Sequence, residues 1–151
     1  MSKRIHYKIW LVVYLLGELM CRSIQYEIRP HAQHNPAWVV YLLGVAPNFF
    51  GAISAPSIIV FLLHFYDLKK HGRIGDLDDY LKKAVLISVS GIVMWEAAQP
   101  LTGKYYFDPQ DILWTFIGAG VFIALALTLK RHFPLYAQAS RSVLIESEMP
   151  A

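Results

Sequence analysis

AWVVYLLGVAPNFFGAISAPSIIVFLLHFY, residues 37–66, contains no Asp, Glu, Lys or Arg. One helix of this length would measure about 45 Å, whereas the hydrocarbon core of a bilayer is about 30 Å thick. Pro47 stands inside the stretch, and a proline inside a helix removes a backbone hydrogen bond and bends or breaks the helix. We therefore expect an interfacial or re-entrant helix over 37–46, a break over 47–51 and a spanning helix over 52–66.

Three further apolar runs flank this stretch and approach the ~20 residues that a spanning helix needs. They lie at 5–24, 80–99 and 108–129. The composition agrees, because 56% of the 151 residues are hydrophobic and 17% are charged, whereas about a quarter are charged in soluble domains. The sequence predicts an all-α fold, a polytopic transmembrane helical bundle of about four spanning helices with one short interfacial or re-entrant helix.

Three polar segments separate the apolar runs, and we expect them to be loops. They are 22–36, 67–83 and 100–107. At the start of the last run, Asp108 suits a helix N-cap and Pro109 suits the first helical position. We expect a transmembrane domain over 1–131 and a cytoplasmic tail over 132–151.

Basic residues are distributed unevenly between the two sides of this topology. With the N-terminus in the cytoplasm, three of the 14 Lys and Arg fall on the outer side, and the other eleven are cytoplasmic. The outer three are Arg22, Arg29 and Lys104. Because short basic loops are retained in the cytoplasm, we expect a multi-pass protein with both termini on the cytoplasmic side.

Several functional classes lack their usual signals in this sequence. There is one cysteine, which excludes an intrachain disulfide. His31 and His34 form the only close histidine pair, and loop polarity explains them better than a metal, because no third ligand is near. Nucleic-acid motifs, phosphate loops and hydrolase motifs are missing. We expect no metal, no cofactor and no nucleic-acid partner.

An unusual set of acids and amides falls on the outer side of this topology. An acid within a membrane costs about 2.5–3.5 kcal/mol on insertion scales, so its presence needs a reason. Four separate segments supply the set, and we expect it to form one polar layer at the outer boundary. The candidate ligand-binding residues are Glu18, Asn48, Glu96, Gln99, Asp108 and Asp111.

Most of these residues also have a structural interpretation. Glu18 precedes an arginine by one helical turn, so an ion pair at the helix end explains it as well as ligand binding does. Asp108 fits a helix cap better than a ligand, and Asn48 fits a partner for broken backbone. Asp111 suits capping, ligand contact or both. Glu96 has no basic neighbour in the sequence, which makes it the strongest functional candidate.

Small residues recur along the third and fourth apolar runs. In a membrane, small side chains let two helix backbones approach closely. We interpret these residues as packing positions rather than as a site. They are Ala84, Ser88, Gly91, Gly118, Gly120 and Ala124.

The stretch WEAAQPLTGKYYFDPQDILWTFIGA, residues 95–119, resembles the VanZ-like family. That family's pattern is Glu-x-x-Gln, Gly-Arg, Phe-Asp-x-x-Asp and Asn-Thr-x-Gly-Ala, from which Lys104 and Thr115 depart. Upstream, residues 47–50 look like the family's Asn-x-x-x-Phe segment. The resemblance implies a protein of the bacterial cytoplasmic membrane, related to resistance against lipoglycopeptides such as teicoplanin, with its shared acids and amides in an outer-leaflet site.

Three hypotheses about function follow. In the leading one, which is not enzymatic, the outward acidic pocket binds an envelope lipid, a lipid-linked envelope component or an amphiphilic antibiotic and modulates envelope sensitivity. In the second, the protein is a membrane enzyme acting on a lipid-linked cell-wall intermediate, with Glu96 and Asp111 as acid and base. In the third, it is a structural subunit of a larger membrane complex.

Overall fold

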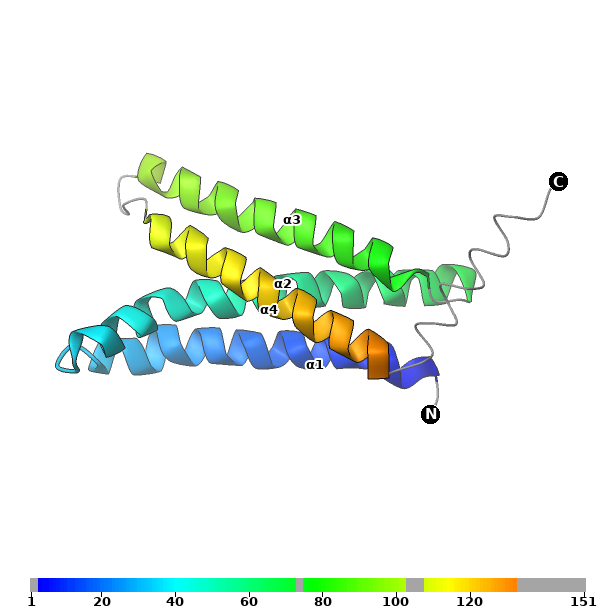
Figure 1. The fold of residues 1–151 in the computed structure, drawn as a ribbon, viewed down its shortest axis with the longest axis horizontal. Coiled ribbons are helices and arrows are strands. Elements are labelled where there is room, and N and C mark those ends of the chain that lie inside the picture. The colour runs from blue at the N-terminus through cyan, green and yellow to red at the C-terminus, as the bar shows by residue number, and fades with distance from the viewer. Residues whose placement is uncertain (1–2, 73–74, 103–107, 133–151) are drawn as a thin grey trace.

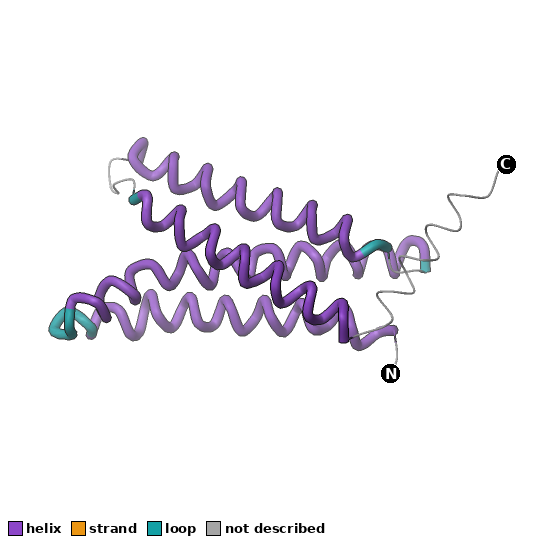
Figure 2. The backbone as a smooth tube through the Cα atoms, viewed as in Figure 1, coloured by secondary structure: helices purple, strands orange, loops and turns teal. Residues whose placement is uncertain are grey.

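The structure is a bundle of four long helices joined by short connections (Figure 1). The computed structural model describes residues 3–72, 75–102 and 108–132. No strand occurs within these ranges, so the all-α prediction is confirmed (Figure 2). Nearly all of the predicted tail, 133–151, lies outside the described residues. The helices are α1 Lys3–Arg22, α2 Ala37–His71, α3 Leu77–Ala98 and α4 Pro109–His132.

Helix α2 is one continuous helix of 35 residues. The predicted break over 47–51 and the separate interfacial or re-entrant helix over 37–46 are therefore wrong. Pro47 and Pro56 both lie inside α2, and each proline removes one backbone hydrogen bond. The helix persists because α1, α3 and α4 all pack against it, and this packing outweighs the local preference for a break.

The chain beyond α1 is more helical than the sequence predicted. A π-helical turn over Ser23–Ile28 continues α1, and a 3₁₀ turn over Arg29–His31 follows it. The prediction of a loop over 22–36 is therefore wrong for its first half. A π-helical turn is wider than an α-helical one and a 3₁₀ turn is tighter, but both continue the helical path. The polar residues that follow α1 therefore keep fixed positions beside α2.

Three of the described helices are long and apolar enough to cross a membrane, namely α2, α3 with its following turn, and α4. Helix α1 is not among them, because five of its 20 residues are charged. It nevertheless packs along α2, and its outward leucines Leu15, Leu16 and Leu19 are each more than half exposed. An apolar face of this kind is suited to lipid.

The hydrophobic core lies in the half of the bundle that includes the α2–α3 turn (Figure 1). All four helices contribute to it, and the rings of Trp10 and Phe122 lie 5.5 Å apart at its centre. Small side chains on α3 and α4 let these helices approach the aromatic pair. The core residues are Trp10, Val60, Leu77, Leu81, Ala84, Phe122 and Ala126.

The α2–α3 turn is shorter than predicted, because α2 ends at His71 and α3 begins at Leu77. Gly72 ends α2 in the left-handed conformation with φ of 66°, which glycine adopts without steric cost. The Tyr80 hydroxyl donates a hydrogen bond to Asp67 across the turn and accepts one from the Gly75 amide at 2.9 Å. These hydrogen bonds hold the α2–α3 turn in place at this end of the bundle.

Candidate functional site

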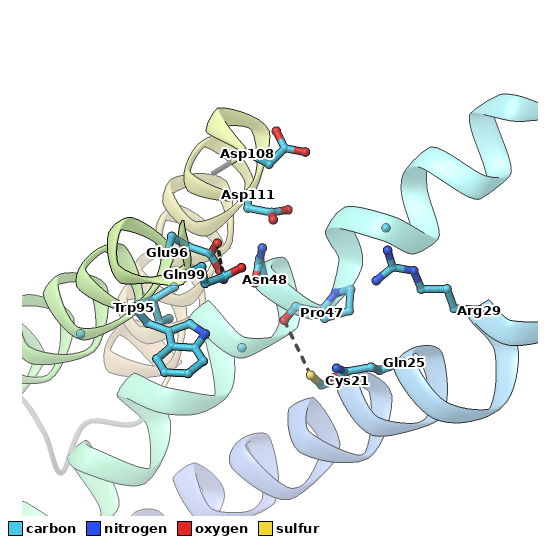
Figure 3. Close-up of a pocket in the computed structure, with 14 residues that line it drawn as sticks. Cys21, Gln25, Arg29, Pro47, Asn48, Trp95, Glu96, Gln99, Asp108 and Asp111 are labelled. Atoms are coloured by element: carbon cyan, nitrogen blue, oxygen red, sulfur yellow. Dashed lines mark hydrogen bonds between the residues drawn. The ribbon is translucent and has the colours of Figure 1, made fainter. Parts of the chain in front are cut away.

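A pocket of about 760 Å³ lies between helices α1 and α2 on one side and α3 and α4 on the other (Figure 3). It occupies the end of the bundle away from the hydrophobic core. Its volume falls within the range of roughly 300–1,000 Å³ that is typical of small-molecule sites. Its polar lining residues are Gln25, Arg29, Asn48, Glu96, Gln99, Asp108 and Asp111.

The structure brings five of the six candidate residues to this pocket, and Glu18 is the exception. One carboxylate oxygen of Glu18 accepts a hydrogen bond from Ser54 on α2 at 3.3 Å. Its other oxygen lies 3.6 Å from Nε of Arg22, one turn further along α1. The ion-pair interpretation of Glu18 is therefore confirmed, and its carboxylate is engaged in joining α1 to α2.

Glu96 is the most buried polar side chain of the pocket, with 3% of its surface exposed. It lies in the last turn of α3, and its carboxylate accepts a hydrogen bond of 2.6 Å from the side-chain amide of Gln99 (Figure 3). The carboxylates of Asp111 and Asp108 are close enough to repel its charge. The structure thus brings three acids together. The most buried of them, Glu96, accepts a hydrogen bond from the Gln99 side chain.

Asp108 and Asp111 owe their positions to the start of α4. The Asp108 carboxylate accepts a hydrogen bond of 2.9 Å from the backbone N–H of Gln110. The backbone carbonyl of Asp108 accepts one of 3.1 Å from the backbone N–H of Asp111. Asp108 is therefore the N-cap of α4, as the sequence predicts. Negative charge at a helix N-terminus is favoured by the helix dipole, so the cap also supplies part of the acidity of the pocket.

Asn48 connects the two halves of the pocket. It projects from α2 toward Asp111 on α4 (Figure 3), and both residues line the pocket. The expectation that Asn48 satisfies broken backbone is wrong, because α2 is unbroken at this point. Its side chain instead faces an acid across the boundary between α2 and α4 (Figure 3).

Sequence reasoning missed the pocket residues that follow α1, among them Gln25 and Arg29. The Arg29 guanidinium attracts the Asp111 carboxylate, and Arg29 is the one basic residue among the described residues that line the pocket. Cys21 also lines it, with its sulfur 3.7 Å from the Pro47 carbonyl. These three residues recur at intervals of four, which would place them on one side of a helix. The prediction of a loop over 22–36 did not use this spacing.

Three glycines make the pocket wide. A Cβ added at Gly44, Gly51 or Gly91 would meet no atom within 4 Å, and all three line the pocket. The packing interpretation of Gly91 is therefore wrong, and Gly120 likewise has open space beside it. The packing interpretation is confirmed at Gly118, where a Cβ would overlap the backbone oxygen of Phe49 on α2.

The chemistry of the pocket is that of a polar binding site with a negative bias. Among residues 3–72, 75–102 and 108–132, no group of three His, Cys, Asp or Glu side chains could hold a metal ion. Carboxylates, amides and one guanidinium are suited to holding hydroxyl, amine and phosphate groups. No protein-family model, no curated protein and no solved structure matches this chain.

Proposed function

We propose that this chain is a VanZ-like integral membrane protein of the bacterial cytoplasmic membrane. Its outward-facing acidic pocket binds the head group of an envelope lipid or of an amphiphilic antibiotic of the lipoglycopeptide type, and this binding modulates the sensitivity of the envelope. The observation that carries the proposal is the pocket of about 760 Å³, in which α2, α3 and α4 bring together Asn48, Glu96 and Asp111.

The arrangement of charge along the bundle supports the outward direction of the pocket. The α2–α3 turn and the end of α4 lie at the same end of the bundle (Figure 1). The residues that line the pocket lie toward the opposite end. Basic residues of the last turns of α2 and α4 gather at the end that holds the α2–α3 turn. Retention of basic residues in the cytoplasm would leave the pocket on the outer side.

The proposal is tested by filling the pocket without disturbing the fold. Gly91→Leu places a side chain in the pocket, where the added Cβ meets no atom within 4 Å. Gly120→Leu is the matched control, because Gly120 has equally open space but does not line the pocket. Both variants and the unchanged protein are expressed in a teicoplanin-susceptible bacterium at equal membrane levels, and the minimum inhibitory concentration is measured.

We expect the unchanged protein and Gly120→Leu to alter teicoplanin sensitivity and Gly91→Leu to leave the host at its starting value. Equal sensitivity in the three strains and in a strain with empty vector would refute the proposal. An effect that survives in Gly91→Leu would show that the pocket is not its source.

The proximity of two carboxyl groups favours a second candidate, an enzyme acting on a lipid-linked cell-wall intermediate. The Asp111 carboxylate is close enough to Glu96 to act on its charge, and a general acid and base that serve one substrate must lie near each other. Turnover of such an intermediate by purified protein, lost in Glu96→Gln, would favour this candidate. Binding without turnover would favour the first.

A further inference from the structure

The charged groups of the pocket are divided between two walls. Glu96 on α3 and the two aspartates of α4 form one wall, and Arg29, beyond the end of α1, faces them from the other (Figure 3). Asn48 lies between the walls, beside Asp111 (Figure 3). A ligand that spans the pocket therefore meets carboxylates at one end and a guanidinium at the other.

This division favours one class of head group over the others. An anionic head group with no positive charge would find one guanidinium and three carboxylates, and the like charges would oppose its binding. A head group that carries both a phosphate and a primary ammonium complements both walls. Its ammonium also gives the buried Glu96 carboxylate a cationic partner, which an acid at membrane depth requires.

The pocket also extends away from the carboxylates, along α2 and α3 toward the middle of the bundle. Gly51 lies about one turn deeper along α2 than Asn48, and Gly91 lies five residues before Glu96 along α3, a distance of about 7.5 Å at 1.5 Å per residue. A Cβ at either glycine would meet nothing within 4 Å. Ile92 lines the pocket beside Gly91, so this glycine slot between α2 and α3 has an apolar wall.

The side of the slot formed by α3 is poorly covered by the protein. The side chains of Met94 and Trp95 are 71% and 62% exposed, although α3 is among the helices long and apolar enough to span a membrane. Exposed apolar side chains at that depth face lipid. A lipid can therefore reach the slot sideways from the bilayer, with its chain between the helices and its head group at the charged walls.

We propose that the occupant of the pocket is a phospholipid with a primary amine, held with its ammonium at Glu96 and Asp111, its phosphate at Arg29 and an acyl chain in the slot beside Gly51 and Gly91. The inference rests on the proposed function, because it names the class of amphiphile that the pocket binds. The lipid reaches the site from the bilayer, without leaving the membrane.

The test compares lipids that differ only in the head group. Purified protein in detergent is incubated with phosphatidylethanolamine, phosphatidylcholine or phosphatidylglycerol of identical chains, and retained lipid is counted by native mass spectrometry. Phosphatidylcholine has a quaternary ammonium that cannot donate hydrogen bonds, and phosphatidylglycerol has no positive charge. We expect retention in the order phosphatidylethanolamine, phosphatidylcholine, phosphatidylglycerol.

Variants separate the two walls and the slot. Glu96→Gln removes one charge-assisted hydrogen bond, so the preference for phosphatidylethanolamine over phosphatidylcholine should fall about tenfold. Arg29→Gln should weaken retention of all three lipids and leave their order unchanged. Gly91→Leu should reduce retention of all three by obstructing the slot, whereas Gly120→Leu should match the unchanged protein.

The outcomes distinguish this inference from the proposed function. Preferred retention of phosphatidylglycerol, or equal retention of the amine and choline lipids, would overturn the amine-bearing head group. If Gly91→Leu still abolished retention, the pocket would remain an amphiphile site. Displacement of phosphatidylethanolamine by teicoplanin at lower concentration would overturn a phospholipid as the preferred occupant and favour the antibiotic.

Discussion

Burying the Glu96 carboxylate has a free-energy cost that other groups in the pocket must offset. An acid at membrane depth costs about 2.5–3.5 kcal/mol on insertion scales, and a hydrogen bond to a charged group returns about 1.5–3 kcal/mol. The 2.6 Å bond from Gln99 therefore offsets much of this cost. The neighbouring charges of Asp108 and Asp111 add to the cost. A cationic ligand would lower it, which is the physical reason to expect one.

Because Gly118 has no side chain, α4 can approach α2 closely at this position. A Cβ at this position would overlap the backbone oxygen of Phe49 and lie 3.0 Å from Cβ of Ala52. Backbone cannot move aside as a flexible side chain can, so Gly118→Leu should destabilise the bundle by about 1–3 kcal/mol or more. Thermal unfolding in detergent, followed by tryptophan fluorescence, measures the loss.

Gly120→Leu serves as the control for Gly118→Leu, because it adds the same side chain to α4 where the space is open. It should unfold at the temperature of the unchanged protein. Equal stability of the two variants would show that α4 does not approach α2 as described. Gly120 is also exposed, so loss of function in a stably folded Gly120→Leu would favour the structural-subunit hypothesis.

Among single residues, the sequence alone predicted the acids of the pocket. It did not predict most of the residues that lie beside these acids. Asp108 followed from a local rule, because an N-cap needs only its own helix start. The hydrogen bond between Glu96 and Gln99 joins residues one helical turn apart, and the sequence predicts both as candidate ligand-binding residues. Asn48 on α2 and Asp111 on α4 both line the pocket, and no local pattern in the sequence places them together. Arg29 was missed because its position depends on a π-helical turn that propensity does not reveal.

Helix α2 shows where local rules fail at the scale of an element. Two internal prolines and a length beyond the bilayer thickness favoured a break, yet α2 is continuous from Ala37 to His71. At 1.5 Å per residue its 35 residues measure about 52 Å, so at least one of its ends must extend beyond the hydrocarbon core. Contacts with all three other helices supply the stabilisation that the proline positions lack.

The α2–α3 turn depends on the hydroxyl of Tyr80. Tyr80→Phe removes the donor to Asp67 and the acceptor for the Gly75 amide and changes the shape of the side chain little. Loss of these bonds leaves polar groups unsatisfied, so the free energy of unfolding should fall by about 1–3 kcal/mol. Chemical denaturation in mixed micelles measures it.

Lys83→Ala is the control at the same end of α3. It removes an exposed ion pair with Asp79, one turn apart on the helix, and exposed pairs of this kind contribute little. Stability should therefore change much less than in Tyr80→Phe. If the two variants lost equal stability, or if Tyr80→Phe lost none, the hydroxyl would not be the element that fixes the turn.

The whole molecule has two dissimilar ends. One half is closed by the hydrophobic core and the fixed α2–α3 turn, and the other half holds the polar pocket. The sequence predicted a polar layer at one end of the bundle, because charge pattern and apolar runs report on whole segments, but it did not predict where the hydrophobic core lies. It could not give the pocket its shape, because the open glycine positions and the continuation of α1 depend on how the helices pack.

Labelling of Cys21 tests directly whether the open polar pocket faces the outer side of the membrane. Cys21 is the one cysteine of the chain and lines the pocket, so a membrane-impermeant maleimide reports on this position alone, with Cys21→Ser as the blank. We expect labelling in right-side-out vesicles and none in inside-out vesicles until detergent is added. Labelling from the cytoplasmic side only, or none without detergent in either preparation, would contradict an outward-facing pocket.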